Sequence, residues 1–195
     1  LTDVTGVQTC ALPILAARKR GMKAYIVMPR NSPDIKKEAV KGYGGEIEFC
    51  EPTLAARESG LAEVIARTHA EVVHPYNDRR VIAGQATAAL EIFEEIIDLD
   101  IIMTPVGGGG LLSGTALTTF YLSPRTRVIA AEPEAADDAF RSFRAGKIIP
   151  VGKADTIADG LKTSLGEITF PIIRKHVHDI RSEEHTSELQ SRQSI

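Results

Sequence analysis

Apolar runs of strand length alternate with amphipathic helical stretches along most of this chain, and this alternation constrains its fold more than any other feature. The run from Ala24 to Met28 precedes a helical stretch with Ser32 as the expected N-cap and Pro33 at the first helical position. Strands that alternate with helices indicate parallel sheets built from crossover units, so the predicted class is α/β. The predicted strands are 24–28, 46–49, 72–73, 101–106 and 128–131, and the predicted helices are 33–42, 55–68, 82–97, 113–121, 137–145 and 170–177.

The alternating units fall into two series, which predicts two domains. The segment from His74 to Arg80, with its proline and polar residues, is the expected boundary. We therefore expect a small α/β domain at 15–77 and part of a larger one at 78–180. Each is expected to form three α/β/α layers around a mainly parallel sheet.

The two ends of the chain are related through the genetic code. Residues 4–14 and 181–191 can be encoded by opposite strands of one DNA segment, and that DNA looks like a sequencing-library adapter. We expect 1–14 and 181–195 to be translated adapter, the alternative being a natural tail and a polar C-terminal helix. On this interpretation, 15–180 is an internal fragment truncated at both ends, and Cys50 is its only cysteine.

Composition excludes several classes of function. The 195 residues are 43% hydrophobic and 25% charged, with 23 basic and 26 acidic side chains, as in an ordinary globular protein. The basic clusters are short, which argues against nucleic acid as a partner. Apolar runs such as 101–106 are far below the roughly 20 residues that a transmembrane helix needs. No secretory signal is visible, so the sequence predicts a cytoplasmic protein.

Four consecutive glycines, Gly107 to Gly110, lie between a predicted buried strand and a predicted helix and are followed by Leu111. Glycines are kept where no side chain fits, and backbone amides at a helix N-terminus bind phosphate. A flexible turn is the simpler alternative. A dinucleotide fingerprint fits poorly, because its third glycine falls on Ser113, although Glu132 lies at the expected distance for an NAD-binding Rossmann domain. No lysine and hydroxyl pair follows, so a nucleotide P-loop is excluded.

From Leu15 to Ile180 the chain resembles the pyridoxal-phosphate enzymes of the serine/threonine dehydratase and serine racemase group, whose fold is that of the tryptophan synthase β subunit. The resemblance implies that Gly107, Gly108, Gly109, Gly110 and the amide of Leu111 hold the phosphate of pyridoxal 5'-phosphate (PLP). It rests on five segments in order, which are 24–29 with 42–44, 81–85, 105–110, 131–138 and 156–160.

The resemblance also implies a metal site and a loop that faces the cofactor. The carboxylates of Glu132 and Asp138 and the carbonyl of Ala136 would bind Mg²⁺, or Ca²⁺ or Mn²⁺, with water completing the shell. The alternative is a surface acidic turn that caps the helix beginning near Asp137. Gly160 would lie in the loop facing cofactor and substrate, unless that loop is only a connecting turn.

The implied reaction is deamination of L-serine or L-threonine, by loss of water and then of ammonia, to a 2-oxo acid. Serine racemase is the alternative within the same chemistry. The family's Schiff-base lysine is absent from this chain, since none of its lysines occupies a matching motif. The chain alone is therefore expected to be inactive. Its longer parent is expected to act on small amino acids as a homo-oligomer, a dimer.

Overall fold

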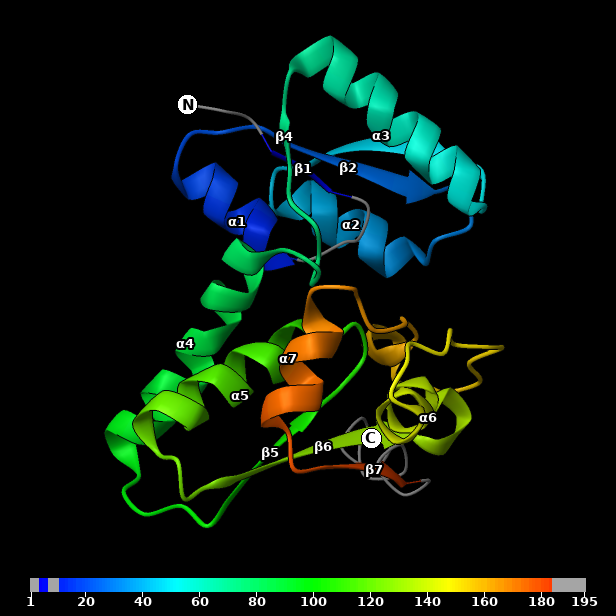
Figure 1. Cartoon of the computed structure of the whole chain (residues 1–195). Helices are drawn as coiled ribbons and strands as arrows, with labels where there is room; N and C mark the ends of the chain where they lie inside the picture. The colour runs from blue at the N-terminus through cyan, green and yellow to red at the C-terminus, as the bar shows by residue number, and fades with distance from the viewer. Residues whose placement is uncertain (1–3, 7–10, 184–195) are drawn as a thin grey trace. The chain divides into compact units, whose positions relative to one another are not determined.

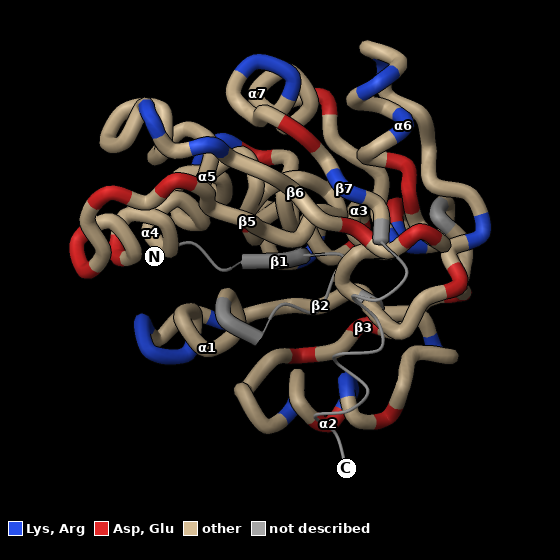
Figure 2. Tube along the Cα trace, turned by 90° about the horizontal axis from the view of Figure 1, so that it is seen from below, with Lys and Arg blue, Asp and Glu red and all other residues tan. Residues whose placement is uncertain are grey.

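The computed structural model describes residues 4–6 and 11–183 and divides the chain into two units, Leu1–Pro75 and Tyr76–Ile195 (Figure 1). The division falls inside the predicted boundary segment. Acidic and basic positions occur in both units (Figure 2).

The first unit is a parallel sheet of four strands in the order β3-β2-β1-β4. Residues 24–28 are all buried, as expected for a strand with both faces covered. The elements are β1 (Val4–Gly6), α1 (Ala11–Lys19), β2 (Ala24–Pro29), α2 (Asp34–Gly42), β3 (Glu46–Cys50), α3 (Leu54–Thr68) and β4 (Glu71–Val72).

The side chains of β2 alternate between two cores, which makes this unit three-layered. Ile26 and Met28 pack with residues of α1 and α2 on one face. Tyr25 and Val27 pack with Val64 of α3 on the other. The predicted α/β/α arrangement is confirmed here.

The terminal stretches assigned to adapter take part in this fold where they are described. Val4–Gly6 pairs with β2 and β4, and Ile14 is 1% exposed in the core. The sequence predicts no element at 4–6, and the structure places a strand there. β1 has only three residues, too few for an apolar or alternating pattern to mark it as a strand. The DNA origin of the two ends stays a prediction.

The starts of α2 and α4 differ from the prediction. Pro33, with φ −54° and ψ 140°, occupies the N-cap position expected for Ser32, and α2 begins at Asp34. The helix predicted from Ile82 begins three residues earlier, because the carboxylate of Asp78 accepts the Arg80 amide at 2.7 Å and caps the helix.

The second unit contains a parallel sheet of three strands in the order β5-β6-β7. Its helices cover the face of β5 that carries Ile102, while Ile101 and Met103 on the other face are 46% and 58% exposed. The elements are α4 (Arg79–Glu95), β5 (Ile101–Pro105), α5 (Gly110–Leu122), β6 (Arg127–Pro133), η1 (Glu134–Ala136), α6 (Asp138–Ala145), η2 (Asp159–Leu161), α7 (Thr169–His176) and β7 (Asp179–Glu183).

Candidate functional site

The glycine run joins the carboxyl end of β5 to the N-terminus of α5, as the sequence predicts. Gly109 adopts φ 88°, a left-handed conformation that favours glycine, and α5 begins at Gly110 rather than at the predicted Ser113. The Ser113 amide donates to the Gly109 carbonyl at 2.9 Å. The amides of Gly110 and Leu111 come before this bond and belong to the unpaired first turn of the helix, the usual position for binding an anion.

The chain itself explains why these positions lack side chains. A Cβ on Gly107 would lie 2.8 Å from the Gly160 carbonyl oxygen, and one on Gly108 would lie 2.3 Å from the ring of Tyr76. A Cβ on Gly109 would lie 2.8 Å from the Ile173 side chain. The sequence predicts that no side chain fits in the run. Of the close neighbours, Gly160 is a predicted site residue, and Tyr76 and Ile173 are not.

Gly160 lies in η2, and its carbonyl oxygen is the atom nearest to a Cβ at Gly107. Gly160 itself is exposed, and a Cβ there would have no neighbour within 4 Å. The structure thus brings the predicted loop next to the glycine run. The space around Gly160 leaves room for a ligand to approach its backbone. Its role in binding a ligand stays a prediction.

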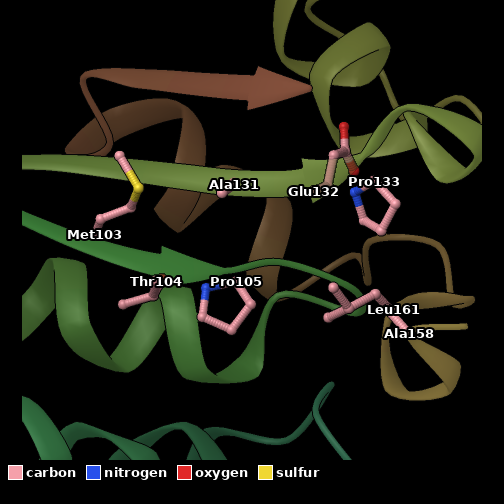
Figure 3. Close-up of a pocket in the computed structure, with 8 residues that line it drawn as sticks. All are labelled: Met103, Thr104, Pro105, Ala131, Glu132, Pro133, Ala158 and Leu161. Atoms are coloured by element: carbon pink, nitrogen blue, oxygen red, sulfur yellow. The ribbon is translucent and has the colours of Figure 1, made fainter. Parts of the chain in front are cut away.

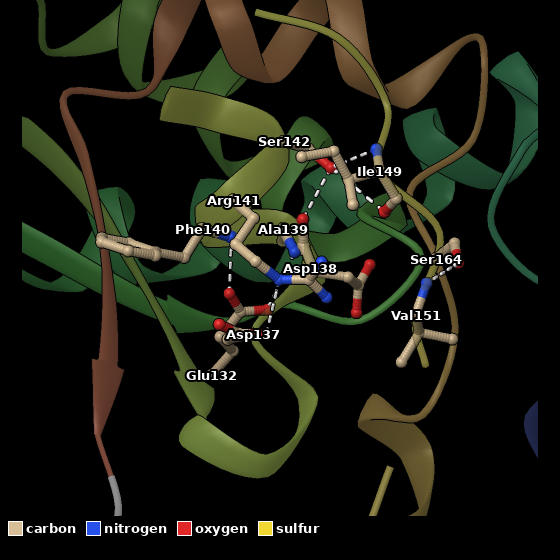
Figure 4. Close-up of polar contacts among 10 residues, drawn as sticks. All are labelled: Glu132, Asp137, Asp138, Ala139, Phe140, Arg141, Ser142, Ile149, Val151 and Ser164. Carbon is tan, nitrogen blue, oxygen red and sulfur yellow. Dashed lines mark hydrogen bonds and ion pairs between the residues drawn. The ribbon is translucent and has the colours of Figure 1, made fainter. Parts of the chain in front are cut away.

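Glu132 lies near the end of β6 and is 1% exposed. Its two carboxylate oxygens accept the Phe140 amide at 2.5 Å and the Ala139 amide at 3.2 Å, in the first turn of α6 (Figure 4). Burial raises the pKa of the Glu132 carboxyl to about 8, despite these two hydrogen bonds, which lower it. Glu132 therefore does cap α6, as the simpler alternative proposes, but it does so in the interior and not at the surface.

Asp138 begins α6 beside this carboxylate and is also 1% exposed. Burial raises the pKa of Asp138 to about 6, and its Oδ2 atom has no hydrogen-bond partner among the described residues. The third predicted ligand, Ala136, is buried in η1. Two buried carboxylates, one with an unpartnered oxygen, suit a hard cation with oxygen ligands. The described residues contain no set of three acidic, histidine or cysteine side chains that would bind a metal.

A cavity of about 340 Å³ opens at the carboxyl ends of β5 and β6, and its lining includes Thr104, Glu132 and, from the η2 side, Ala158 and Leu161 (Figure 3). The Thr104 hydroxyl is buried and has no hydrogen-bond partner within the described part of the chain. Ligands of open α/β sheets bind at this edge, outside the carboxyl ends of the strands. The cavity and the glycine run thus share one edge of the second unit.

Tyr76 also belongs to this site. Its ring packs on Gly108, and burial, followed by the negative charge of Asp138, raises the pKa of its hydroxyl. No local pattern marks Tyr76, because its neighbours in space come from a segment more than thirty residues away in the sequence.

A family model described as "Pyridoxal-phosphate dependent enzyme" matches residues 2–188. The chain belongs to this family. That membership confirms the resemblance at family level and sets aside the NAD-binding alternative. Among the described helices, none is both long enough and apolar enough to cross a membrane.

Relatives within the family carry several activities in their names. The chain is 52% identical over 165 residues to "beta-hydroxyaspartate dehydratase" from Paracoccus denitrificans (strain Pd 1222), covering 85% of the chain and 52% of that protein. It matches the structure of maize serine racemase with a TM-score of 0.92 and 40% identity, covering 98% of this chain and 59% of that one. It matches the structure of a threonine deaminase from T.th. with a TM-score of 0.87 and 39% identity, covering 94% of this chain and 62% of that one.

The chain spans about half the length of the curated relatives it matches. The parallel sheets of this chain and its match to both solved structures confirm the predicted α/β class. Serine racemase and threonine deaminase are comparably similar neighbours, so family membership does not choose between the predicted lyase and the racemase.

Proposed function

We propose that this chain carries the phosphate-binding part of a PLP-dependent enzyme that deaminates L-serine or L-threonine to a 2-oxo acid. The observation that supports this most is the glycine run at the N-terminus of α5, where the amides before Ser113 lie outside the helix ladder. When bound, PLP supplies an electron sink for the bonds at the substrate's α-carbon. The amides of Gly107 to Gly110 and Leu111 would hold its phosphate and so orient the ring.

The choice of a lyase is supported by two relatives whose names describe elimination or deamination, a β-hydroxyaspartate dehydratase and a threonine deaminase. The choice of a racemase is supported by the maize enzyme. Both reactions remove the same α-proton, and they differ in whether the β-hydroxyl leaves or a proton returns on the opposite face. Serine racemase is therefore the second candidate.

We also propose that Glu132, Asp138 and the Ala136 carbonyl hold a divalent cation, Mg²⁺ in the first instance. The unpartnered Asp138 oxygen and the burial of both carboxylates support this. The cation would neutralise charge that the protein interior otherwise opposes. It would also fix the junction between β6 and α6, at the edge of the sheet where the cavity opens.

The longer protein provides the decisive test. We propose that the chain alone is inactive because it lacks a lysine in the family's Schiff-base motif, and that the full-length protein is a cytoplasmic homodimer. The full-length protein should release ammonia and pyruvate from L-serine when PLP is present. Formation of D-serine without pyruvate would instead establish the racemase. Absence of both products, with PLP bound, would refute the proposed substrate class.

A further inference from the structure

Thr169 begins α7 and contacts the glycine run from far along the sequence. The residue has no solvent exposure, and its hydroxyl lies 2.8 Å from the carbonyl oxygen of Gly108, which is 61 residues away. The Gly166 amide donates to the same hydroxyl oxygen at 2.9 Å. The Thr169 side chain therefore links the start of α7 to the middle of the glycine run.

The hydrogen atom of this hydroxyl has two possible acceptors. A threonine hydroxyl donates once, and here the Gly166 amide already occupies one acceptor position on its oxygen. The Gly108 carbonyl at 2.8 Å is closer than the Gly166 carbonyl at 3.2 Å. The shorter distance matches the usual length of a hydroxyl hydrogen bond, so the proton lies toward Gly108.

This bond fixes the direction of an amide in the run. In a trans peptide the carbonyl and the following N–H point in opposite directions, and no peptide bond of the described chain is cis. Because the Gly108 carbonyl points to Thr169, the Gly109 amide points away from α7. A peptide between two glycines would otherwise rotate readily, since neither residue has a Cβ to restrict it.

Neighbouring hydrogen bonds hold Thr169 in place. The Ser113 hydroxyl of α5 donates to the Thr169 carbonyl at 3.4 Å. The Asn77 side-chain oxygen accepts the Ile168 amide at 2.8 Å, just before the helix. The backbone on either side of the Thr169 hydroxyl is thus fixed by partners from two other segments.

We infer that Thr169 is a positioning residue, which orients the Gly108–Gly109 peptide so that the Gly109 amide is ready to bind a phosphate monoester. The inference rests on the proposed function and deepens it, because it names a residue that prepares the binding loop without touching the ligand. Preorganised amides bind an anion more tightly, since the loop loses less conformational freedom on binding.

The test compares Thr169→Val with Thr169→Ser in the full 195-residue chain. The probe is pyridoxine 5'-phosphate, which has no aldehyde to react with lysines, and pyridoxine is the matched ligand without phosphate. Thr169→Val should weaken binding of the phosphorylated probe about five- to tenfold, the value of one lost hydrogen bond, and leave pyridoxine binding unchanged. Thr169→Ser keeps the hydroxyl and should bind within about twofold of the original chain.

Thr119→Val is the control for a general loss of stability. Its hydroxyl is also buried and donates to the Thr115 carbonyl at 2.8 Å, within α5 and away from the glycine run. This variant should lose stability in urea yet keep its affinity for the phosphorylated probe. Equal loss of affinity in both valine variants would overturn the positioning role.

Two further outcomes separate this inference from the function on which it rests. If the original chain does not prefer pyridoxine 5'-phosphate to pyridoxine, the phosphate site is refuted and the inference with it. If the preference exists and Thr169→Val retains it, only the positioning role is refuted. Should Thr169→Val not fold, amide NMR of the original chain decides, because the Gly109 amide must shift with the phosphorylated probe and not with pyridoxine.

Discussion

Two glycines in the packed helices α4 and α5 should respond in opposite ways to replacement by alanine. Gly114 of α5 is buried, and a Cβ there would lie 2.6 Å from the Ala86 amide nitrogen and 2.8 Å from the Ile82 carbonyl oxygen. Both atoms belong to the backbone of α4. Gly84 lies in α4, is exposed, and a Cβ there would have no neighbour within 4 Å.

The magnitude follows from the contact at Gly114. Ordinary contact begins at about 3.4 Å, so α4 and α5 must separate locally by about 0.8 Å to admit the methyl group. A gap of this size forfeits a quarter to a half of each affected dispersion contact. It also stretches the hydrogen bond from the Thr118 hydroxyl to the Ala86 carbonyl, now 3.2 Å, whose loss costs about 1 kcal/mol.

Overpacking of this kind costs about 1–3 kcal/mol, and the higher helix propensity of alanine returns about 1 kcal/mol. With the strained hydrogen bond added, Gly114→Ala should lower the free energy of unfolding by about 2 kcal/mol. Gly84→Ala should raise it by about 0.5–1 kcal/mol, because only the propensity term applies.

Urea melts followed by circular dichroism measure both differences, and the slope of unfolding free energy against urea should stay constant. A Gly114→Ala chain as stable as the original would refute the argument, because the two helices would then have room for a side chain at their closest approach. Destabilisation by Gly84→Ala would show that this position is not open to a side chain.

Three further predictions concern a cap, a cation and an exposed face. Asp78→Ala should cost about 1 kcal/mol at pH 7 in urea melts. The side-chain hydrogen bond with Arg80 lowers the pKa of Asp78, so this stability is present above its unfolded pKa and is lost as pH falls through the folded pKa. Asp78→Asn should keep the cap without that pH dependence. Mg²⁺ should raise the melting temperature of the original chain and leave the melting temperature of the Glu132→Gln variant unchanged. An equal rise in the variant would refute the cation site. Met103→Lys should change stability by less than about 0.5 kcal/mol and reduce self-association in sedimentation experiments, because Met103 is 58% exposed.

Local sequence patterns were sufficient for the elements whose burial is repetitive. The all-apolar run at Ala24 predicts a strand because both of its faces are covered, and the structure places β2 there. The glycine run was predicted between a strand and a helix because its composition alone forbids side chains, and it lies there. Both features follow from the side chains of the segment itself, apolar in β2 and absent in the glycine run, and so they can be recognised in the sequence.

Helix boundaries were predicted less well, because they depend on single side-chain bonds. The Asp78 carboxylate starts α4 three residues before its apolar pattern begins. At Ser32 the expected cap forms no such bond, and the neighbouring proline takes the position. Hydrophobic periodicity indicates which face of a helix is buried. It does not indicate which side-chain oxygen accepts a backbone amide and so caps the helix.

By itself, the sequence determined the α/β class, the position of the glycine run and the resemblance to PLP enzymes, since these follow from composition and order along the chain. Only the tertiary structure decided that Val4–Gly6 lies inside a sheet, that Glu132 caps α6 from the interior, and that Thr169 holds the Gly108 carbonyl. Each of these depends on atoms brought together by the closure of the whole fold, and pairing across such distances leaves no periodic trace in either partner.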